Sequence, residues 1–188
     1  MTFRNNPFRK GGNRKITYGK NWEDLHGQQG PVEWNKMMNR GLDNPHTVSY
    51  VKDILKFSSS ELSIENPLFL LLVRHWKNGH TRISAGRIFQ DFFIEDSSSA
   101  HVGSGSVYNL NLSSDIRETV TAHFKQKTGA WTFPGSLFDD ASRFVIRNLV
   151  DTTTRLKKKT VIISNDQEMK NARDYVEKHA PKLLIYFV

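Results

Sequence analysis

The feature that most constrains the fold of this chain is a series of short segments in which apolar residues recur every three or four positions. The clearest segment runs from Leu68 to Trp76 and stops at Asn78-Gly79. Apolar residues at this spacing line one side of an α-helix. Similar segments, separated by turn residues, cover 31–38, 45–57, 84–94, 115–124, 136–156 and 166–179. Six or seven short helices with few strand signals predict an all-α multi-helix bundle.

The start of the segment around Leu68 is open to two interpretations. Pro67 can be the first residue of a helix capped by Asn66, because proline is tolerated where the first N–H has no partner. Alternatively, the helix begins behind a Ser63 cap and Pro67 lies one turn inside it. In both cases Ser63 and Asn66 stand at the beginning of this helix.

The last part of the chain carries a mixed pattern. A helix is predicted from Asp166 to His179, and strand-like apolar runs flank it at 160–163 and 183–188. Two strands alone do not form a stable sheet. We therefore expect a helix and an apolar tail that pack on the rest of the molecule. The predicted parts are an N-terminal arm over 1–30, a helical domain over 31–160 and a C-terminal appendage over 161–188.

The arm is basic. Six Lys and Arg residues precede Glu23, the first acidic residue, and the whole chain has a formal net charge of +8. A solvated tail is the common state of such an arm, and contact with an anionic membrane surface is the functional alternative. Nucleic-acid binding is a third, weaker interpretation, and it depends on the net charge alone.

The cellular compartment is indicated by what the sequence lacks. With no cysteine, the chain has no disulfide, no thiolate nucleophile and no cysteine-bound zinc. The N-terminus has no apolar leader pattern, and the run from Leu68 to Val73 is far shorter than the ~18 residues of a membrane span. We therefore expect a cytoplasmic protein. Contact of the basic arm with anionic lipid would attach it peripherally to the plasma membrane.

The common patterns of catalytic chemistry are also missing. The histidines are scattered without metal-ligand spacing, and Gly103-Ser104-Gly105 is not followed by the rest of a phosphate-binding loop. The adjacent carboxylates of Asp139 and Asp140 diverge on a helix and complement its dipole near the start. We expect no metal, no cofactor and no enzymatic activity, so the residues themselves predict a binding module.

Four blocks of sequence occur in an order that resembles the regulator of G-protein signalling (RGS) family. The run from Glu61 to Lys77 resembles the family helix that begins Ser-Glu-Glu-Asn, with Glu65 and Asn66 on its Glu-Asn pair. The others are Ile88 to Phe93, which resembles Ile-Tyr-x-x-Phe-Ile, Asn111 to Glu118, which resembles Asn-(Ile/Leu)-Asp-Ser-x-x-Arg-Glu, and Phe138 to Ala141, which resembles Phe-Asp-Glu-Ala. The resemblance covers about residues 34 to 156.

This resemblance implies an RGS-like helical bundle that binds the switch segments of a GTP-loaded Gα subunit and accelerates GTP hydrolysis. An RGS domain supplies no reacting group, because Gα already carries its own Arg and Gln and needs only to have them ordered. Carried over by position, Asn111 would enter the Gα active site, and Ser63, Glu65 and Asn66 would meet the switch backbone. The alternative is that these residues are only helix caps.

The last contact segment of the family departs from the pattern here. Asp-Ser-x-x-Arg matches Asp151, Thr152 and Arg155 only after one residue is deleted behind Phe138. With that alignment, the resemblance places Leu149, Asp151, Thr152 and Arg155 at the Gα interface. The departure leaves open a second function, an RGS-like scaffold that binds a protein without accelerating hydrolysis.

Overall fold

A computed structural model describes residues 34–36, 41, 44–79, 83–94, 108–125, 133–156 and 164–188. These residues form helices and turns, and no strand occurs among them, which confirms the all-α prediction. The predicted arm, the Ser/Gly loop around Gly103 and the strand-like run at 160–163 lie outside the described residues. The elements are α3 (Pro45–Ser60), α4 (Glu65–Lys77), α5 (Ala85–Phe93), α6 (Ser114–Lys125), α7 (Asp139–Leu156), α8 (Asp166–His179) and the 3₁₀ helix η1 (Pro181–Tyr186).

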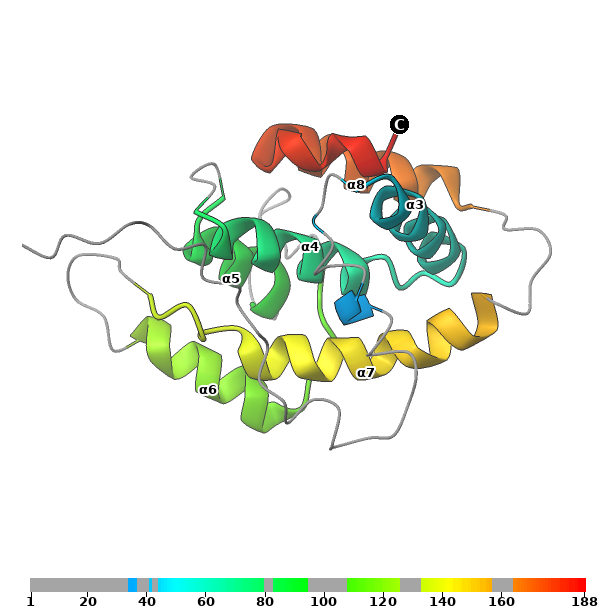
Figure 1. Ribbon diagram of the computed structural model, residues 1–188. Coiled ribbons are helices and arrows are strands. Elements are labelled where there is room, and N and C mark those ends of the chain that lie inside the picture. Colours follow the sequence, from blue (N-terminus) through cyan, green and yellow to red (C-terminus); the bar gives the residue numbers. More distant parts are fainter. Residues whose placement is uncertain are drawn as a thin grey trace, which may run out of the picture.

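Helix α3 lies between two layers. Figure 1 shows α8 and η1 on one side of α3 and α4 and α7 on the other, and all four elements contact it directly. The long helix α7 also packs along α4 and α6, and α5 joins α4 to α6. Because α7 contacts α3, α4 and α6, it holds these three helices together in one bundle.

An aromatic cluster fills the centre of the bundle. The Phe69 ring of α4 lies 5.6 Å from Phe92, 5.8 Å from Phe93 and 6.0 Å from Phe138, measured between ring centroids. The ring planes are tilted or edge-on, as the charge distribution of aromatic rings favours. Since all four side chains are buried, this cluster connects α4, α5 and the start of α7 in one core.

Local capping signals explain where three of the helices begin. The side chains of Asn44, Ser84 and Asn165 accept hydrogen bonds from backbone N–H groups in the first turns of α3, α5 and α8. Pro45 then occupies the first position of α3, where a missing N–H does no harm. At the starts of these three helices, a short polar residue therefore caps the helix as local preference predicts.

Helix α4 begins differently from both interpretations of the sequence. Ile64 is its N-cap, no side chain caps it, and Asn66 lies inside the first turn. The Ser63 hydroxyl donates to the Ser58 carbonyl oxygen at 3.4 Å instead of accepting from the helix. Pro67 is the third residue of α4, which is still within the turn whose N–H groups have no intrahelical partner. The prediction that Ser63 or Asn66 caps α4 is therefore wrong.

The C-terminal segment is helical throughout its described part. Helix α8 has the predicted bounds, and the strand-like run at 183–188 lies mostly in the 3₁₀ helix η1, Pro181–Tyr186. Leu183 and Tyr186, three residues apart, are both buried, and η1 packs against α3 and α8. Tertiary packing of one apolar edge has therefore overridden the strand propensity of these residues. Side chains of α8 and η1 belong to the same hydrophobic core as those of α4 and α7.

A buried polar contact fixes α8 to α5. The Tyr175 hydroxyl of α8 donates to Asp91 Oδ2 of α5 at 2.5 Å, and Arg87 Nε donates to the same oxygen at 2.6 Å. Burial and the hydrogen bond to Asp91 raise the pKa of Tyr175, so the phenol keeps its proton and acts as the donor. Since Asp91 is itself buried, these donors stabilise a charge that would otherwise be unfavourable in the core.

Tyr175→Phe is expected to lower the free energy of unfolding by about 1.5–3 kcal/mol, the usual range for a hydrogen bond to a charged group. The ring is retained, so packing against Tyr108 and Phe92 should change little. The urea midpoint measures the loss, and an unchanged slope would show that the unfolded state is not affected. A variant as stable as the wild type would show that this contact does not hold α8 in place.

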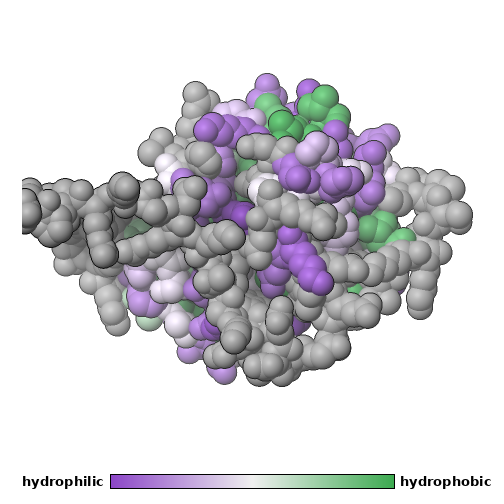
Figure 2. All heavy atoms as spheres, viewed as in Figure 1, coloured by the Kyte–Doolittle hydropathy of each residue, from purple (hydrophilic) through white to green (hydrophobic). Residues whose placement is uncertain are grey.

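The described surface carries few large apolar side chains. Figure 2 shows mainly hydrophilic residues where the described surface is visible, with small apolar patches. The exposed large apolar residues are Leu62, Ile94, Ile185 and Val188. Among the helices whose residues are described, none has both the length and the apolarity needed to cross a membrane.

Candidate functional site

The turn between α3 and α4 is held by hydrogen bonds to the end of α3. The Ser63 N–H donates to the Ser58 carbonyl at 2.9 Å, and the Leu62 N–H donates to the Ser59 carbonyl at 3.3 Å. These two bonds form a Schellman motif, a common way to satisfy the last carbonyls of a helix. The motif fixes the backbone directly before Glu65 and Asn66.

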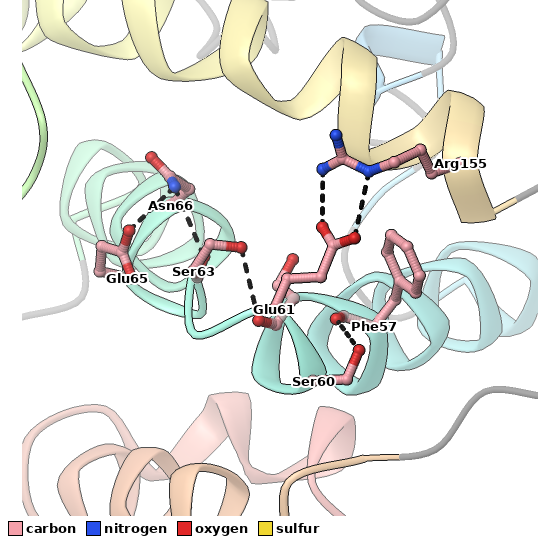
Figure 3. A network of polar contacts seen from close by, with 8 residues as sticks. Phe57, Ser60, Glu61, Ser63, Glu65, Asn66 and Arg155 are labelled. Carbon is pink, nitrogen blue, oxygen red and sulfur yellow. Dashed lines mark hydrogen bonds and ion pairs between the residues drawn. The ribbon is translucent and has the colours of Figure 1, made fainter.

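Glu65 and Asn66 lie side by side at the start of α4 (Figure 3). The Asn66 Nδ2 donates to Glu65 Oε1 at 3.0 Å and to the Ser63 carbonyl at 3.4 Å. Asn66 Oδ1 is shielded from solvent and accepts no hydrogen bond from any described residue. A shielded amide oxygen without a donor is unfavourable for stability.

The Glu65 carboxylate has an unusual electrostatic setting. Burial raises the pKa of Glu65, a backbone hydrogen bond lowers it, and the negative charge of Glu168 on α8 raises it further, with a net increase. No ion pair to Glu65 is formed within the described part of the chain. The carboxylate is therefore partly desolvated beside a like charge, an arrangement that a hydrogen-bond donor from a partner would stabilise.

Glu65→Gln is expected to gain stability relative to the wild type as pH increases. Because folding raises the pKa of Glu65, the folded wild type binds this proton more tightly than the unfolded chain does. Wild-type stability therefore decreases as pH rises through that pKa, and the glutamine variant lacks this decrease. Melting temperatures of both proteins at pH 4 and pH 7 measure the difference. A larger relative gain at pH 4 would contradict the proposed effect of burial.

Arg155 joins this region from the end of α7 (Figure 3). Its Nη2 and Nε donate to the two carboxylate oxygens of Glu61, at 2.7 Å and 3.1 Å. Two parallel bonds between a guanidinium and a carboxylate fix geometry as well as distance. Glu61 is the C-cap of α3, so this ion pair holds the α3–α4 turn against the end of α7 across 94 residues of sequence.

Two further residues expected from the last contact segment, Leu149 and Thr152, are buried. Leu149 is 3% exposed and Thr152 is 5% exposed, because both lie on the face of α7 that packs into the bundle. The side chain of Asp151 lies outside the described structure. Burial makes packing the function of Leu149 and Thr152, so we do not include them among the residues that contact a partner. Arg155 is the residue of this segment whose described side chain is exposed.

Asn111 is presented on a separate, fixed loop between α5 and α6. The Leu112 N–H donates to the Leu110 carbonyl at 2.9 Å, so Asn111 occupies the centre of a three-residue turn. Arg117 holds the loop by donating to the carbonyls of Phe93 and Leu110 at 2.6 and 2.7 Å and to Asn109 Oδ1 at 3.2 Å. Leu110 is buried and Asn111 is exposed, so the loop is anchored on one side and offers the Asn111 amide to solvent on the other.

The arrangement supplies hydrogen-bonding groups rather than reactive ones. Among the described residues, no three side chains of His, Cys, Asp or Glu are grouped as a metal site would require. Asp139 and Asp140 form ion pairs with Lys77 and Arg143, which agrees with a role at the start of α7. The structure brings Ser63, Glu65, Asn66 and Arg155 together around one turn and positions Asn111 on another loop.

Sequence patterns did not identify Glu61 or Leu62 as parts of this region. The role of Glu61 depends on Arg155, 94 residues away, and no local signal gives such a pairing. Leu62 occupies the motif position that usually holds glycine, so no glycine marks this turn in the sequence.

Comparison of the chain with protein-family models, curated protein sequences and solved structures gives no match. Functional assignment therefore depends on the residues themselves and on their geometry.

Proposed function

We propose that this protein binds the switch surface of a GTP-loaded Gα subunit and accelerates its GTP hydrolysis, as RGS domains do. The proposal is supported by the sequence resemblance and by the all-α fold. The observation that carries it is the presentation of Asn111, an exposed amide on a loop that three Arg117 hydrogen bonds hold in place. A fixed amide can both donate and accept, as ordering a catalytic glutamine or threonine requires.

In this account the contribution of the protein to catalysis is to reduce disorder in Gα. Asn111 orders the water-positioning Gln of the GTPase, and Ser63, Glu65 and Asn66 hydrogen-bond the switch backbone. These contacts favour the transition-state arrangement over the ground state, and only such differential binding raises the rate. A hundredfold acceleration corresponds to about 2.7 kcal/mol, which a few well-placed hydrogen bonds can supply.

The proposal is tested by the nucleotide dependence of binding. The full chain should bind a responsive Gα more tightly when the nucleotide is GDP with aluminium fluoride, a mimic of the transferring phosphoryl group, than when it is GDP alone. Titration calorimetry at two salt concentrations measures this preference. Equal affinity for both states would count against the proposal. Loss of binding at the higher salt alone would indicate simple attraction of the basic chain to an acidic surface.

A scaffold without GTPase activation is the second candidate. Burial of Leu149 and Thr152 favours it, because among the described side chains expected from the last contact segment only Arg155 is exposed, and it is already paired with Glu61. This candidate predicts binding to a protein partner with no change in the rate of GTP hydrolysis.

A further inference from the structure

The end of α5 is bonded to the loop that carries Asn111, residues 108–113, which we call the Asn111 loop. The last carbonyls of a helix have no partner within it. The last three carbonyls of α5 accept hydrogen bonds from residues that follow, and the pairs are Tyr108 N–H to Asp91 (3.2 Å), Leu110 N–H to Phe92 (3.3 Å) and Arg117 Nη1 to Phe93 (2.6 Å). The position of the Asn111 loop therefore follows the position of the last turn of α5.

The two backbone bonds between the loop and α5 are long. Most N–H···O bonds measure about 2.9–3.0 Å between the heavy atoms, so side-chain packing must help to hold the loop. The buried ring of Tyr108 stacks on Phe92, with 5.5 Å between centroids, and meets the Tyr175 ring edge-on at 5.4 Å. The inner side of the loop therefore rests on α5 and on α8 together.

Helix α8 reaches the last turn of α5 through Tyr175. Its hydroxyl donates to Asp91 Oδ2 at 2.5 Å, whereas the backbone carbonyl of Asp91 accepts from the loop. A bond to a buried carboxylate is one of the stronger hydrogen bonds in proteins. Figure 1 shows α8 and α6 at opposite edges of the bundle. Tyr175 thus acts from one side of the molecule, and Arg117 of α6 holds the loop from the other.

From these contacts we infer that α8 is a positioning element for the Asn111 loop and that Tyr175 is its positioning residue. While the phenol holds Asp91, the last turn of α5 is fixed relative to α8. The carbonyls that receive the N–H groups of Tyr108 and Leu110 then stay in place. The coupling between α8 and the loop is a property of this chain alone, and only its effect on GTP hydrolysis rests on the proposed function.

Tyr175→Phe is expected to speed amide hydrogen exchange in the Asn111 loop, because it removes the bond to Asp91 and keeps the ring. The N–H groups of Tyr108 and Leu110 should exchange at least about tenfold faster than in the wild type, as loss of a hydrogen bond to a charged group permits. Exchange followed by NMR measures each amide separately. Asp91→Asn keeps an acceptor for the phenol without the charge, so it should give a smaller increase in the same two amides.

Val176→Ala is the matched control. Val176 is the next residue of α8 and is fully buried, and its side chain points about 100° away around the helix. Its truncation should destabilise the whole domain and speed the amides that exchange by global unfolding, while Tyr108 and Leu110 change much less than in Tyr175→Phe. Unchanged exchange of these two amides in Tyr175→Phe and Asp91→Asn would overturn the inference. Equal acceleration in Tyr175→Phe and Val176→Ala would also overturn it, because the loop would then only follow global stability.

Single-turnover GTP hydrolysis tests the consequence for activity. At saturating concentration and with both proteins folded, Tyr175→Phe should stimulate a responsive Gα at least about fivefold less than the wild type, because the Asn111 amide is less well oriented. Val176→Ala should stimulate like the wild type. Faster loop exchange together with full stimulation by Tyr175→Phe would overturn the positioning role and leave the proposed function intact. If the wild type stimulates no Gα, the proposed function fails, and the exchange rates alone decide whether α8 positions the loop.

Discussion

Asn111→Ala is expected to remove most of the acceleration of GTP hydrolysis while leaving the fold intact. The side chain is exposed and makes no hydrogen bond to any described residue, so its loss should change stability by no more than about 0.5 kcal/mol. In the proposed complex, the same amide would order the Gln of Gα, an interaction made chiefly in the transition state. Its removal should lower the single-turnover rate by at least about tenfold, or about 1.4 kcal/mol.

Asn109→Ala is the matched control for this experiment. Asn109 is the same residue type, is also exposed and lies two positions earlier in the same loop. It accepts one hydrogen bond from Arg117. Its truncation therefore tests whether loss of a contact that holds the loop is enough to abolish the acceleration of GTP hydrolysis. Retained acceleration in Asn109→Ala and lost acceleration in Asn111→Ala would assign the effect to the Asn111 amide. Equal loss in both variants would contradict that assignment.

Phe69→Ala is expected to have the largest effect on stability, a loss of about 3–5 kcal/mol in the free energy of unfolding. Phe69 is fully buried and touches three other phenylalanine rings from α5 and from the turn before α7. Removing it leaves a cavity where these elements meet, and a domain of ordinary stability has only about 5–15 kcal/mol to lose. Urea unfolding followed by circular dichroism measures the change.

Phe89→Ala serves as the comparison for Phe69→Ala. Phe89 is only partly buried and stacks on Phe124 of α6, so its loss should be clearly smaller. If the two variants lose the same stability, the rings around Phe69 do not form the central core that the structure indicates.

The fold class and most helices could be predicted because their signals are local. Asn44, Ser84 and Asn165 cap their helices with their own side chains, and apolar spacing gave the buried faces of α4 and α5. The C-terminal run 183–188 could not be assigned in this way. Its β-branched and aromatic residues favour a strand, and only contact with α3 and α8 makes η1 the stable form.

The candidate site was less predictable, because its geometry depends on contacts distant in sequence. Leu149 belongs to the apolar pattern of the segment 136–156, whereas the family resemblance placed it at an interface, and its burial agrees with the apolar pattern. The pairing of Glu61 with Arg155 and the left-handed conformation of Leu62 both follow from how α3 meets α4 and α7. Such features arise from tertiary structure, and no local pattern specifies them.

The central claim is tested most directly by single-turnover GTP hydrolysis in a panel of Gα subunits, each measured with the wild-type chain, with Asn111→Ala, and alone. The account predicts that the wild type accelerates hydrolysis by at least one Gα, and that Asn111→Ala, folded and at the same concentration, does so at least about tenfold less effectively. Hydrolysis rates that stay at the intrinsic value for every Gα, with a wild-type protein shown to be folded, would contradict it.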